Sequence, residues 1–328
     1  MDSFKALVID KNGNDMKIDI RDLSQELLPA GDLTVKIAYS SVNYKDALAS
    51  VPNGNVVKEY PLIPGIDLAG IVISSERDGF KAGDEIIATG YGLGVSHFGG
   101  YSEYARIPAE WAVKLPPGLS MKEAMIYGTA GFTAALSVLA LQESGLTVDK
   151  GPVLVTGATG GVGSVSVAIL AKLGYEVVAS TGKQDSADEL TSLGASRVIS
   201  REELMPAKAR VLEKPIWAGV VDCVGGKQLA SILSAVQYGG AVAISGLTGG
   251  SELPTTVFPF ILRGIRLIGI DSVDVAMQAR QQAWKLMASD YKPASLDSIC
   301  SEITLEQIPE ALQMLLGGKS QGRTVVKL

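Results

Sequence analysis

The sequence has 328 residues, with 29 Lys and Arg against 35 Asp and Glu, which gives a formal net charge of −6. Apolar residues make up 47% and charged residues 20%, as in soluble globular chains, and the length suggests about two domains. One histidine (His97) and two cysteines (Cys223 and Cys300) cannot supply a four-ligand zinc site or a disulfide framework.

Charge and hydropathy predict that nucleic acid and membrane are not partners. An acidic chain without a long basic run is a poor match for nucleic acid. No apolar stretch reaches the ~20 residues that span a bilayer. The first ten residues, MDSFKALVID, lack the pattern of a signal peptide, so we expect a cytoplasmic protein.

Residues 1–115 are rich in short segments typical of β-strands. Segments 33–42, 70–75 and 84–89 are β-branched and bounded by turn residues, which predicts a partly closed β domain. The pattern becomes helical over 120–141, where Ser120 and Glu123 form a plausible capping box.

From residue 151 strands and helices alternate, which predicts a doubly wound parallel sheet. The expected elements are a strand over 152–157, a helix over 162–174, a strand over 176–180, a helix over 185–193, strands over 197–200 and 219–224, a helix over 226–236, and strands over 241–246 and 265–270. Helices over 275–289 (partly exposed) and 304–316 follow, and the strand 323–328 is expected to return to the first domain.

The segment VTGATGGVGS (155–164) joins a predicted strand to a predicted helix. A dinucleotide site needs a tight glycine turn there, because the backbone must approach a pyrophosphate at the helix N-terminus. Gly160 and Gly163 occupy the second and third glycine positions of the fingerprint, while Ala158 departs from the first. The alternative is a structural βα turn without a ligand.

The end of the next strand indicates which nucleotide binds. An NAD site usually carries an acidic residue at that point, whereas this chain has Ser180, Thr181, Gly182 and Lys183. Hydroxyls and a lysine suit a 2′-phosphate, so NADPH is favoured. The alternative for Lys183 is a solvated lysine at a helix start.

Five segments together resemble the medium-chain dehydrogenase/reductase superfamily: NYKD (43–46), PGIDLAG (64–70), GGYSEYARI (99–107), AGFTAA (130–135) and TGATGGVG (156–163). The resemblance covers essentially the whole chain and is greatest to the zinc-free quinone oxidoreductases, in particular the acryloyl-CoA reductase subgroup. It implies a Rossmann doubly wound α/β domain over 125–272. It also implies a GroES-like, partly closed β-barrel catalytic domain built from 1–124 and 273–328.

The zinc ligands of related alcohol dehydrogenases are missing from the matching positions. NYKD contains no cysteine, and Asp67 stands where the zinc enzymes carry His-Glu. We therefore expect no metal and a structural role for Asp67.

The resemblance implies hydride transfer from NADPH to a C=C bond conjugated to a carbonyl, as in an acryloyl-CoA-type thioester. The enzyme must then stabilise the carbonyl oxygen and protonate the α-carbon. Tyr44 is the first candidate for this polar catalytic group, with Asn43 and Asp46 orienting the loop or the ribose. Two alternatives stay open, namely that Tyr44 only packs and that water supplies the proton.

Tyr91, His97 and Phe98 share a glycine-flanked loop and would shape the substrate pocket, and we favour a loop-fixing role for His97 over a general acid. Further contacts follow from the resemblance. Arg201 would lie near the adenine or the 2′-phosphate, although an exposed helix-start arginine is equally expected. The predicted cofactor contacts are Tyr44, Thr159, Gly160, Gly161, Val162, Gly163, Ser180, Thr181, Gly182, Lys183, Arg201, Leu247, Ile261, Ser272 and Arg323.

No compact basic cluster identifies a site for a CoA phosphate, so a thioester, a free enone and a quinone all remain possible substrates. A quinone or alkenal reductase of loose specificity is one alternative function. An NADPH-binding protein with a structural or sensory role is another. The apolar segment IRLIGI (265–270) matches the strand through which the superfamily forms homodimers.

Overall fold

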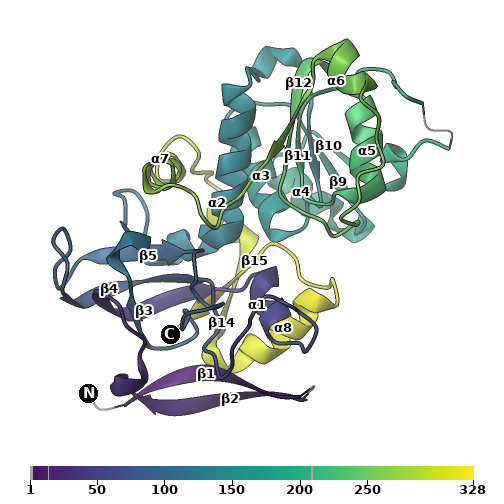
Figure 1. Cartoon of the computed structure of the whole chain (residues 1–328). Helices are drawn as coiled ribbons and strands as arrows, with labels where there is room; N and C mark the ends of the chain where they lie inside the picture. The colour runs from purple at the N-terminus through teal and green to yellow at the C-terminus, as the bar shows by residue number, and fades with distance from the viewer. Residues whose placement is uncertain (1–2, 14, 208–209) are drawn as a thin grey trace. The chain divides into compact units, whose positions relative to one another are not determined.

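The computed structural model describes residues 3–13, 15–207 and 210–328, which form two compact units (Figure 1). The first unit contains the chain up to Thr129 together with Val273–Trp284 and Asp297–Leu328. The second unit contains Ala130–Ser272 and Lys285–Leu296. The first unit is therefore built from both ends of the chain.

The main sheet of the first unit has the strand order β14-β15-β3-β4-β5-β7, with β6 pairing to β3 beside this path. Its strands are β3 (Leu33–Ser41), β4 (Asp67–Ser75), β5 (Glu85–Thr89), β6 (Tyr104–Ile107), β7 (Ala112–Lys114), β14 (Cys300–Thr304) and β15 (Arg323–Lys327). All pairs are antiparallel except β14 with β15. Among the described residues, hydrogen bonds do not close this sheet into a full barrel, and the predicted partly closed β fold is confirmed.

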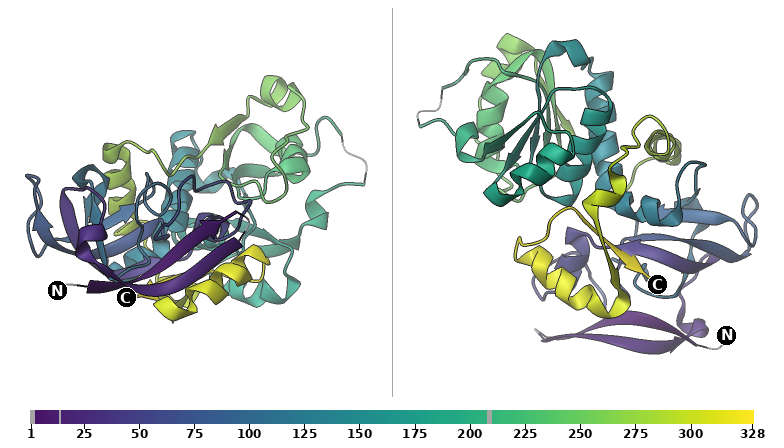
Figure 2. Two further views of the ribbon diagram at one scale, coloured as in Figure 1. Left: turned by 60° about the horizontal axis from the view of Figure 1, so that its bottom comes forward. Right: turned by 180° about the vertical axis from the view of Figure 1, so that it is seen from behind.

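A hairpin, β1 (Ser3–Asn12) and β2 (Asp15–Ser24), lies beside α8 (Ile308–Leu316) in both views of Figure 2. The two share an apolar core, since Phe4, Leu7 and Leu312 belong to one buried cluster. The N-terminal and C-terminal segments are thus joined by hydrophobic burial, which contributes roughly 25 cal/mol per Å² of apolar surface.

The second unit contains a parallel sheet with the order β10-β9-β8-β11-β12-β13, flanked by helices (Figures 1 and 2). Its strands are β8 (Val153–Thr156), β9 (Val177–Thr181), β10 (Arg197–Ser200), β11 (Trp217–Asp222), β12 (Val236–Ile244) and β13 (Arg266–Gly269). Its helices include α3 (Gly161–Lys172), α4 (Ala187–Ser192), α5 (Gly226–Ser234) and α6 (Phe258–Arg263). The doubly wound α/β fold is confirmed, and the strand order reverses between β8 and β11, where such sheets bind ligands.

Helix α2 (Met121–Glu143) is interrupted at Gly128, which has φ 49° and ψ −157°. Its predicted capping box is confirmed, because Ser120 and Glu123 each accept the other's backbone N–H. By length and composition α2 could cross a bilayer, which the count of consecutive apolar residues did not indicate. However, 78% of its most apolar window is buried within the protein, as expected of a core helix.

Candidate functional site

The phosphate loop of the second unit connects β8 to α3. Gly157 takes a left-handed conformation with φ 58°, and α3 starts at Gly161 directly after Gly160. A Cβ atom at Gly163 would collide with the carbonyl oxygen of Gly157, so only glycine lets the helix start this close to the strand. The loop therefore presents free helix N–H groups from Gly161 and the two residues that follow it, an arrangement suited to a pyrophosphate.

The end of β9 lies beside this loop, and the end of β10 lies beside the end of β9. The hydroxyls of Thr159 and Thr181 are 3.3 Å apart, which joins the phosphate loop to β9. The hydroxyl of Ser180 is buried and has no hydrogen-bond partner among the described residues. An unpaired buried hydroxyl costs free energy, and a ligand oxygen would satisfy it.

Two cations meet at the same place. A Cβ atom at Gly182 would lie 2.7 Å from Nε of Arg201, so the guanidinium rests directly against the glycine. Burial lowers the pKa of Lys183, the nearby charge of Glu189 raises it, and the nearby charge of Arg201 lowers it. Like charges held together repel each other, and a bound phosphate would offset this repulsion.

A cavity of about 610 Å³ lies at the carboxyl ends of β12 and β13. Leu247 lines this cavity. Asp271, the residue directly before Ser272, also lines it. The hydroxyl of Ser272 accepts a 2.8 Å hydrogen bond from Thr133. The structure therefore brings Leu247 close to the segment that leads to Ser272, whereas Ile261 lies on α6, 71% exposed and outside the cavity lining.

Asp222, at the end of β11, is a buried residue of this region that the sequence did not single out. Its carboxylate accepts hydrogen bonds of 2.7 Å from the hydroxyl of Thr156 and from the backbone N–H of Gly225. Burial raises the pKa of Asp222. The residue thus fixes the turn after β11 to the end of β8, and an acidic residue closing an apolar strand was the available signal.

In the first unit, Asp46 is fully buried at the start of α1 (Tyr44–Ala49). Oδ1 accepts the N–H groups of Gly65 and Ile66, and Oδ2 accepts Asn43 N–H and the Tyr101 hydroxyl. Burial, with the charge of Asp67, raises the pKa of Asp46 to about 7. All these contacts are internal, so Asp46 positions the loop that carries Tyr44.

A buried polar cluster lies next to Asp46. One oxygen of Asp67 accepts the Ser41 hydroxyl at 2.6 Å and the Asn43 amide at 2.7 Å. The other accepts the Thr129 hydroxyl at 2.5 Å. Arg323, only 3% exposed, donates to Ser41 Oγ and to the carbonyl oxygens of Val42 and Ile126. The cluster fixes Asn43 on the loop that leads into α1.

The backbone of Gly128 lies directly against three side chains of this cluster. A Cβ atom there would lie 2.5 Å from Oδ2 of Asp67, 2.5 Å from Oγ of Ser41 and 2.7 Å from the guanidinium of Arg323. Its positive φ also disfavours any side chain. The break in α2 therefore makes room for the cluster.

Tyr44 differs from these buried neighbours, because it is 51% exposed. It is the first residue of α1, and its neighbours Asn43 and Asp46 form the capping box of that helix. A phenol on a rigid first turn, open to solvent, can reach a substrate without rearrangement of its backbone.

The three residues predicted for the substrate pocket lie on the loop that follows β5. The ring nitrogens of His97 are 3.1 and 3.2 Å from the carbonyl oxygens of Phe98 and Ala30. These contacts favour the loop-fixing interpretation of His97. The Tyr91 ring stacks on Trp111, with centroids 5.8 Å apart, and Phe98 is half-buried against the core of the hairpin β1–β2.

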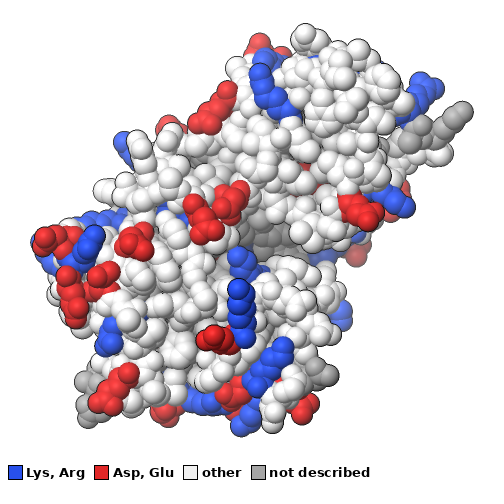
Figure 3. All heavy atoms as spheres, in the orientation of Figure 1, with Lys and Arg blue, Asp and Glu red and all other residues white. Residues whose placement is uncertain are grey.

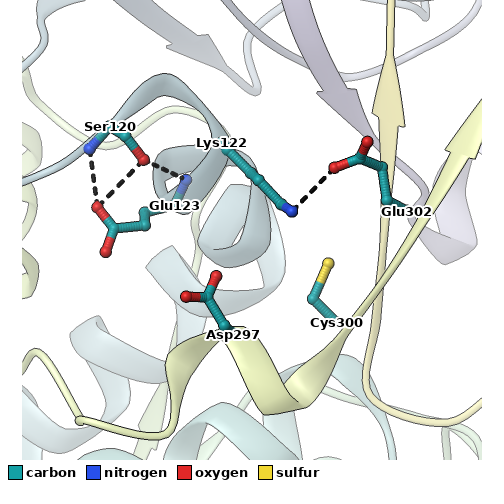
Figure 4. A pocket seen from close by; sticks show the side chains of 6 residues that line it. All are labelled: Ser120, Lys122, Glu123, Asp297, Cys300 and Glu302. Atoms are coloured by element: carbon teal, nitrogen blue, oxygen red, sulfur yellow. Dashed lines mark hydrogen bonds and ion pairs between the residues drawn. The ribbon is translucent and has the colours of Figure 1, made fainter.

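A second cavity of about 520 Å³ lies within the first unit and holds none of the predicted site residues (Figure 4). Lys122 pairs with Glu302 at 2.9 Å, and Ser120 pairs with Glu123 in the capping box. Cys300 also lines this cavity, and burial raises the pKa of its thiol, which disfavours the reactive thiolate. Helix capping and one ion pair account for much of the polar character of this cavity.

The parallel sheet with its phosphate loop, joined to a separate antiparallel unit, defines a dinucleotide-binding α/β protein. The family described as alcohol dehydrogenase GroES-like domain matches residues 29–117, and the family described as zinc-binding dehydrogenase matches residues 161–289. The chain belongs to the medium-chain dehydrogenase/reductase family, which confirms the resemblance.

Two curated relatives cover nearly all of the chain. YhfP of Bacillus subtilis, named as a quinone oxidoreductase, is 56% identical over 99% of both chains. AcuI of Ruegeria pomeroyi, named acrylyl-CoA reductase, is 49% identical over 98% of both chains.

Two solved structures are similar over 99% of both chains. The crystal structure of yhfP from Bacillus subtilis with NAD bound has a TM-score of 0.98 at 56% identity. The yhdH oxidoreductase of Salmonella enterica in complex with NADP has a TM-score of 0.96 at 47% identity.

The zinc in the family description does not fit the residues of this chain. Within the described ranges, no group of three or more His, Cys, Asp or Glu side chains is placed to hold a metal ion. The carboxylate of Asp67 already accepts hydrogen bonds from Ser41, Asn43 and Thr129. The residues around Asp67 thus form a hydrogen-bonded cluster with the donors that a carboxylate requires, in place of a metal-ligand set.

Proposed function

We propose that the chain is an NADPH-dependent oxidoreductase that reduces a C=C bond conjugated to a carbonyl, with an acryloyl-CoA-type thioester as the preferred substrate. The second unit binds the cofactor, and the first unit supplies the polar groups for the substrate. The relative named acrylyl-CoA reductase supports the substrate class, at 49% identity over 98% of both chains.

The observation that carries the cofactor assignment is the pair of cations at the end of β9. Arg201 lies against Gly182 with Lys183 nearby, and Ser180 and Thr181 of the same strand end bring an unpaired hydroxyl and a contact to Thr159 of the phosphate loop. A 2′-phosphate would neutralise both cations and accept the hydroxyl hydrogen. The solved relative with NADP supports this assignment, whereas the one with NAD makes a direct comparison of the two cofactors necessary.

Bound NADPH supplies the hydride. The phosphate loop would hold the pyrophosphate through the N–H groups of Gly161, Val162 and Gly163, with Thr159 and Gly160 shaping the turn. Leu247, which lines the cavity at the ends of β12 and β13, and Ser272 would hold the nicotinamide half. Ile261 and Arg323 stay in the proposed contact set, although the internal hydrogen bonds of Arg323 give it a structural role as well.

As hydride adds to the β-carbon, negative charge develops on the substrate carbonyl oxygen. The Tyr44 phenol is proposed to donate a hydrogen bond or a proton, because it is half-exposed on the fixed first turn of α1. Asn43 and Asp46 act by holding that turn. Water remains the alternative proton donor, and His97 and Phe98 remain proposed walls of the substrate pocket.

The rival functions are a quinone or alkenal reductase and an NADPH-binding protein without turnover. The relative named quinone oxidoreductase supports the first rival. NADPH oxidation measured with acryloyl-CoA, a simple enone and a quinone separates the three. A preference of at least tenfold in kcat/KM for the thioester is expected, and equal rates on all acceptors, or tight binding without turnover, would overturn the proposal.

We further propose a cytoplasmic homodimer. β13 forms the edge of the parallel sheet, and α6, which directly precedes it in the chain, exposes Phe258, Ile261 and Leu262. An open edge with apolar neighbours invites pairing with a second copy. On the face drawn in Figure 3, basic and acidic side chains are interspersed, which supports the expectation of no nucleic-acid partner.

A further inference from the structure

Tyr91 is strained in a way that a turn residue need not be. It follows β5 and Gly90 with φ 52°, a left-handed conformation that bulky side chains rarely adopt. Glycine or asparagine would take this conformation more readily. A tyrosine kept there indicates that its ring or hydroxyl performs a task.

The task visible in the structure is attachment of the segment 273–275. The backbone N–H of Tyr91 donates to the carbonyl oxygen of Val273 at 3.3 Å, and its hydroxyl donates to the carbonyl oxygen of Val275 at 3.2 Å. Both ends of one residue therefore bind the same short segment, 182 to 184 positions later in the chain.

Arg280 on α7 (Met277–Met287) reinforces the attachment and is completely buried. Its guanidinium donates to the carbonyl oxygen of Val273 at 2.9 Å and to the carbonyl and hydroxyl oxygens of Thr89 at 2.9 and 2.7 Å. Its central carbon lies 4.5 Å from the centre of the Tyr91 ring, in cation–π contact. Val273 is thus held twice, by the residues that we call the Tyr91–Arg280 clamp.

The clamp lies next to a residue with a proposed role in binding. Val273 is the first residue of the first unit at this crossing, and the preceding Ser272 belongs to the second unit. The hydroxyl of Ser272 accepts the hydrogen bond from Thr133 on α2. The clamp fixes the backbone on the C-terminal side of Ser272, while Thr133 fixes its side chain.

We infer that Tyr91 and Arg280 are positioning residues for the nicotinamide half of the cofactor, acting through Ser272. The inference rests on the proposed NADPH-binding function and gives Tyr91 a task beyond lining the substrate pocket. It requires that the clamp affect binding of the nicotinamide half and leave the adenosine-phosphate half, at Lys183 and Arg201, unaffected.

The test compares NADPH with adenosine 2′,5′-bisphosphate, which carries the 2′-phosphate but no nicotinamide. Three variants are measured by calorimetry. Tyr91→Asn places a residue that tolerates the left-handed conformation and removes the aromatic ring. Tyr91→Phe removes only the hydroxyl. Arg280→Lys keeps the positive charge but removes the planar guanidinium with its several N–H donors. Tyr91→Asn is expected to weaken NADPH binding at least tenfold, and Tyr91→Phe and Arg280→Lys are each expected to weaken it two- to fivefold. The affinity for the bisphosphate should change less than twofold in all three variants.

Backbone amide hydrogen exchange over 271–277 provides a second readout. The exchange should be faster in the variants, and the variant with the largest loss of NADPH affinity should show the largest acceleration. An equal loss of affinity for NADPH and for the bisphosphate, or an unchanged NADPH affinity in all three variants, would overturn the positioning role of the clamp. The proposed function would not be affected by either result. Failure of the unmodified chain to bind NADPH while it binds the bisphosphate would overturn the proposed function, and the clamp with it. If Tyr91→Asn does not fold, the two conservative variants still decide the question.

Discussion

The hydroxyl of Thr129 donates a 2.5 Å hydrogen bond to Asp67, which lies 62 positions earlier in the chain. The backbone N–H of Thr129 donates to the other oxygen of the same carboxylate at 2.8 Å. Asp67 thereby caps the part of α2 that resumes after the break at Gly128, where the helix leaves Thr129 for the second unit. One carboxylate serves both the candidate catalytic loop and the start of this helical segment.

Asp67→Asn should therefore lower the free energy of unfolding by about 3 kcal/mol or more, because it removes the negative charge beside the buried Arg323. It also replaces one accepting oxygen with an amide NH₂ group that faces the donors of the cluster. Denaturant unfolding measures the change. Thr129→Val, which removes a single donor to the carboxylate, should cost about 1.5–2 kcal/mol. Equal effects of the two substitutions would contradict a shared role for the carboxylate.

Asp46 makes stability depend on pH. Its pKa is raised to about 7 in the folded chain from an ordinary value of 3.8, so the folded state binds the proton more tightly. Its stabilising contribution is full below pH 3.8 and is lost as pH rises through about 7. Asp46→Asn should flatten the stability curve between pH 4 and 7, measured as the difference in melting temperature from the unmodified chain. An unchanged slope would show that Asp46 ionises normally.

Lys183→Ala and Arg201→Ala should each weaken NADPH by about 10- to 100-fold, because each removes a charge-assisted hydrogen bond of roughly 1.5–3 kcal/mol. The affinity for NADH, which lacks the 2′-phosphate, should change less than about threefold. Fluorescence titration gives both dissociation constants. Lys172→Ala, at an exposed lysine of α3, is the matched control. Equal losses for the two cofactors would refute the 2′-phosphate assignment.

Tyr44→Phe keeps the ring and removes the hydroxyl. If the phenol acts as the acid, kcat should fall by about 10²- to 10⁴-fold while the KM for NADPH stays within about twofold. Steady-state kinetics with an acceptor from the panel measures both, and Tyr238→Phe, at a tyrosine that is 84% exposed, serves as the control. A rate within about threefold of the unmodified chain would exclude the Tyr44 phenol as the proton donor.

Ile268→Lys on β13 should convert the proposed dimer to a monomer, because a charge on an edge strand opposes pairing. Sedimentation velocity reports the mass directly. Met205→Lys, at an exposed apolar residue elsewhere in the second unit, should leave the assembly intact. A monomeric unmodified chain, or a dimer that survives Ile268→Lys, would contradict the proposed interface.

The parallel sheet and its phosphate loop could be predicted from sequence because their signals are local. The strand at 197–200 matches β10, and the glycines of 157–163 are required by the geometry of a single turn. Elements with weak local patterns, such as α1 and β14, were missed. The helices expected over 185–193 and 304–316 each begin with a short 3-10 turn.

The buried polar cluster could not be predicted, because its members are distant in sequence. Asp67 and Arg323 meet only through the fold, with Ser41 between them. Helix α7 is partly exposed, as expected, but Arg280 and Trp284 lie on its fully buried face. A single charged residue in a polar helix carries no sign of the oxygen atoms that will surround it.

The break at Gly128 has a consequence for how this chain can vary. Any side chain there would displace a carboxylate, a hydroxyl and a guanidinium together, and would also have to adopt a backbone conformation that it disfavours. No change at a single neighbour could accommodate it. A position with no side chain of its own should therefore be among the least replaceable in the protein, and libraries for directed evolution should leave it fixed.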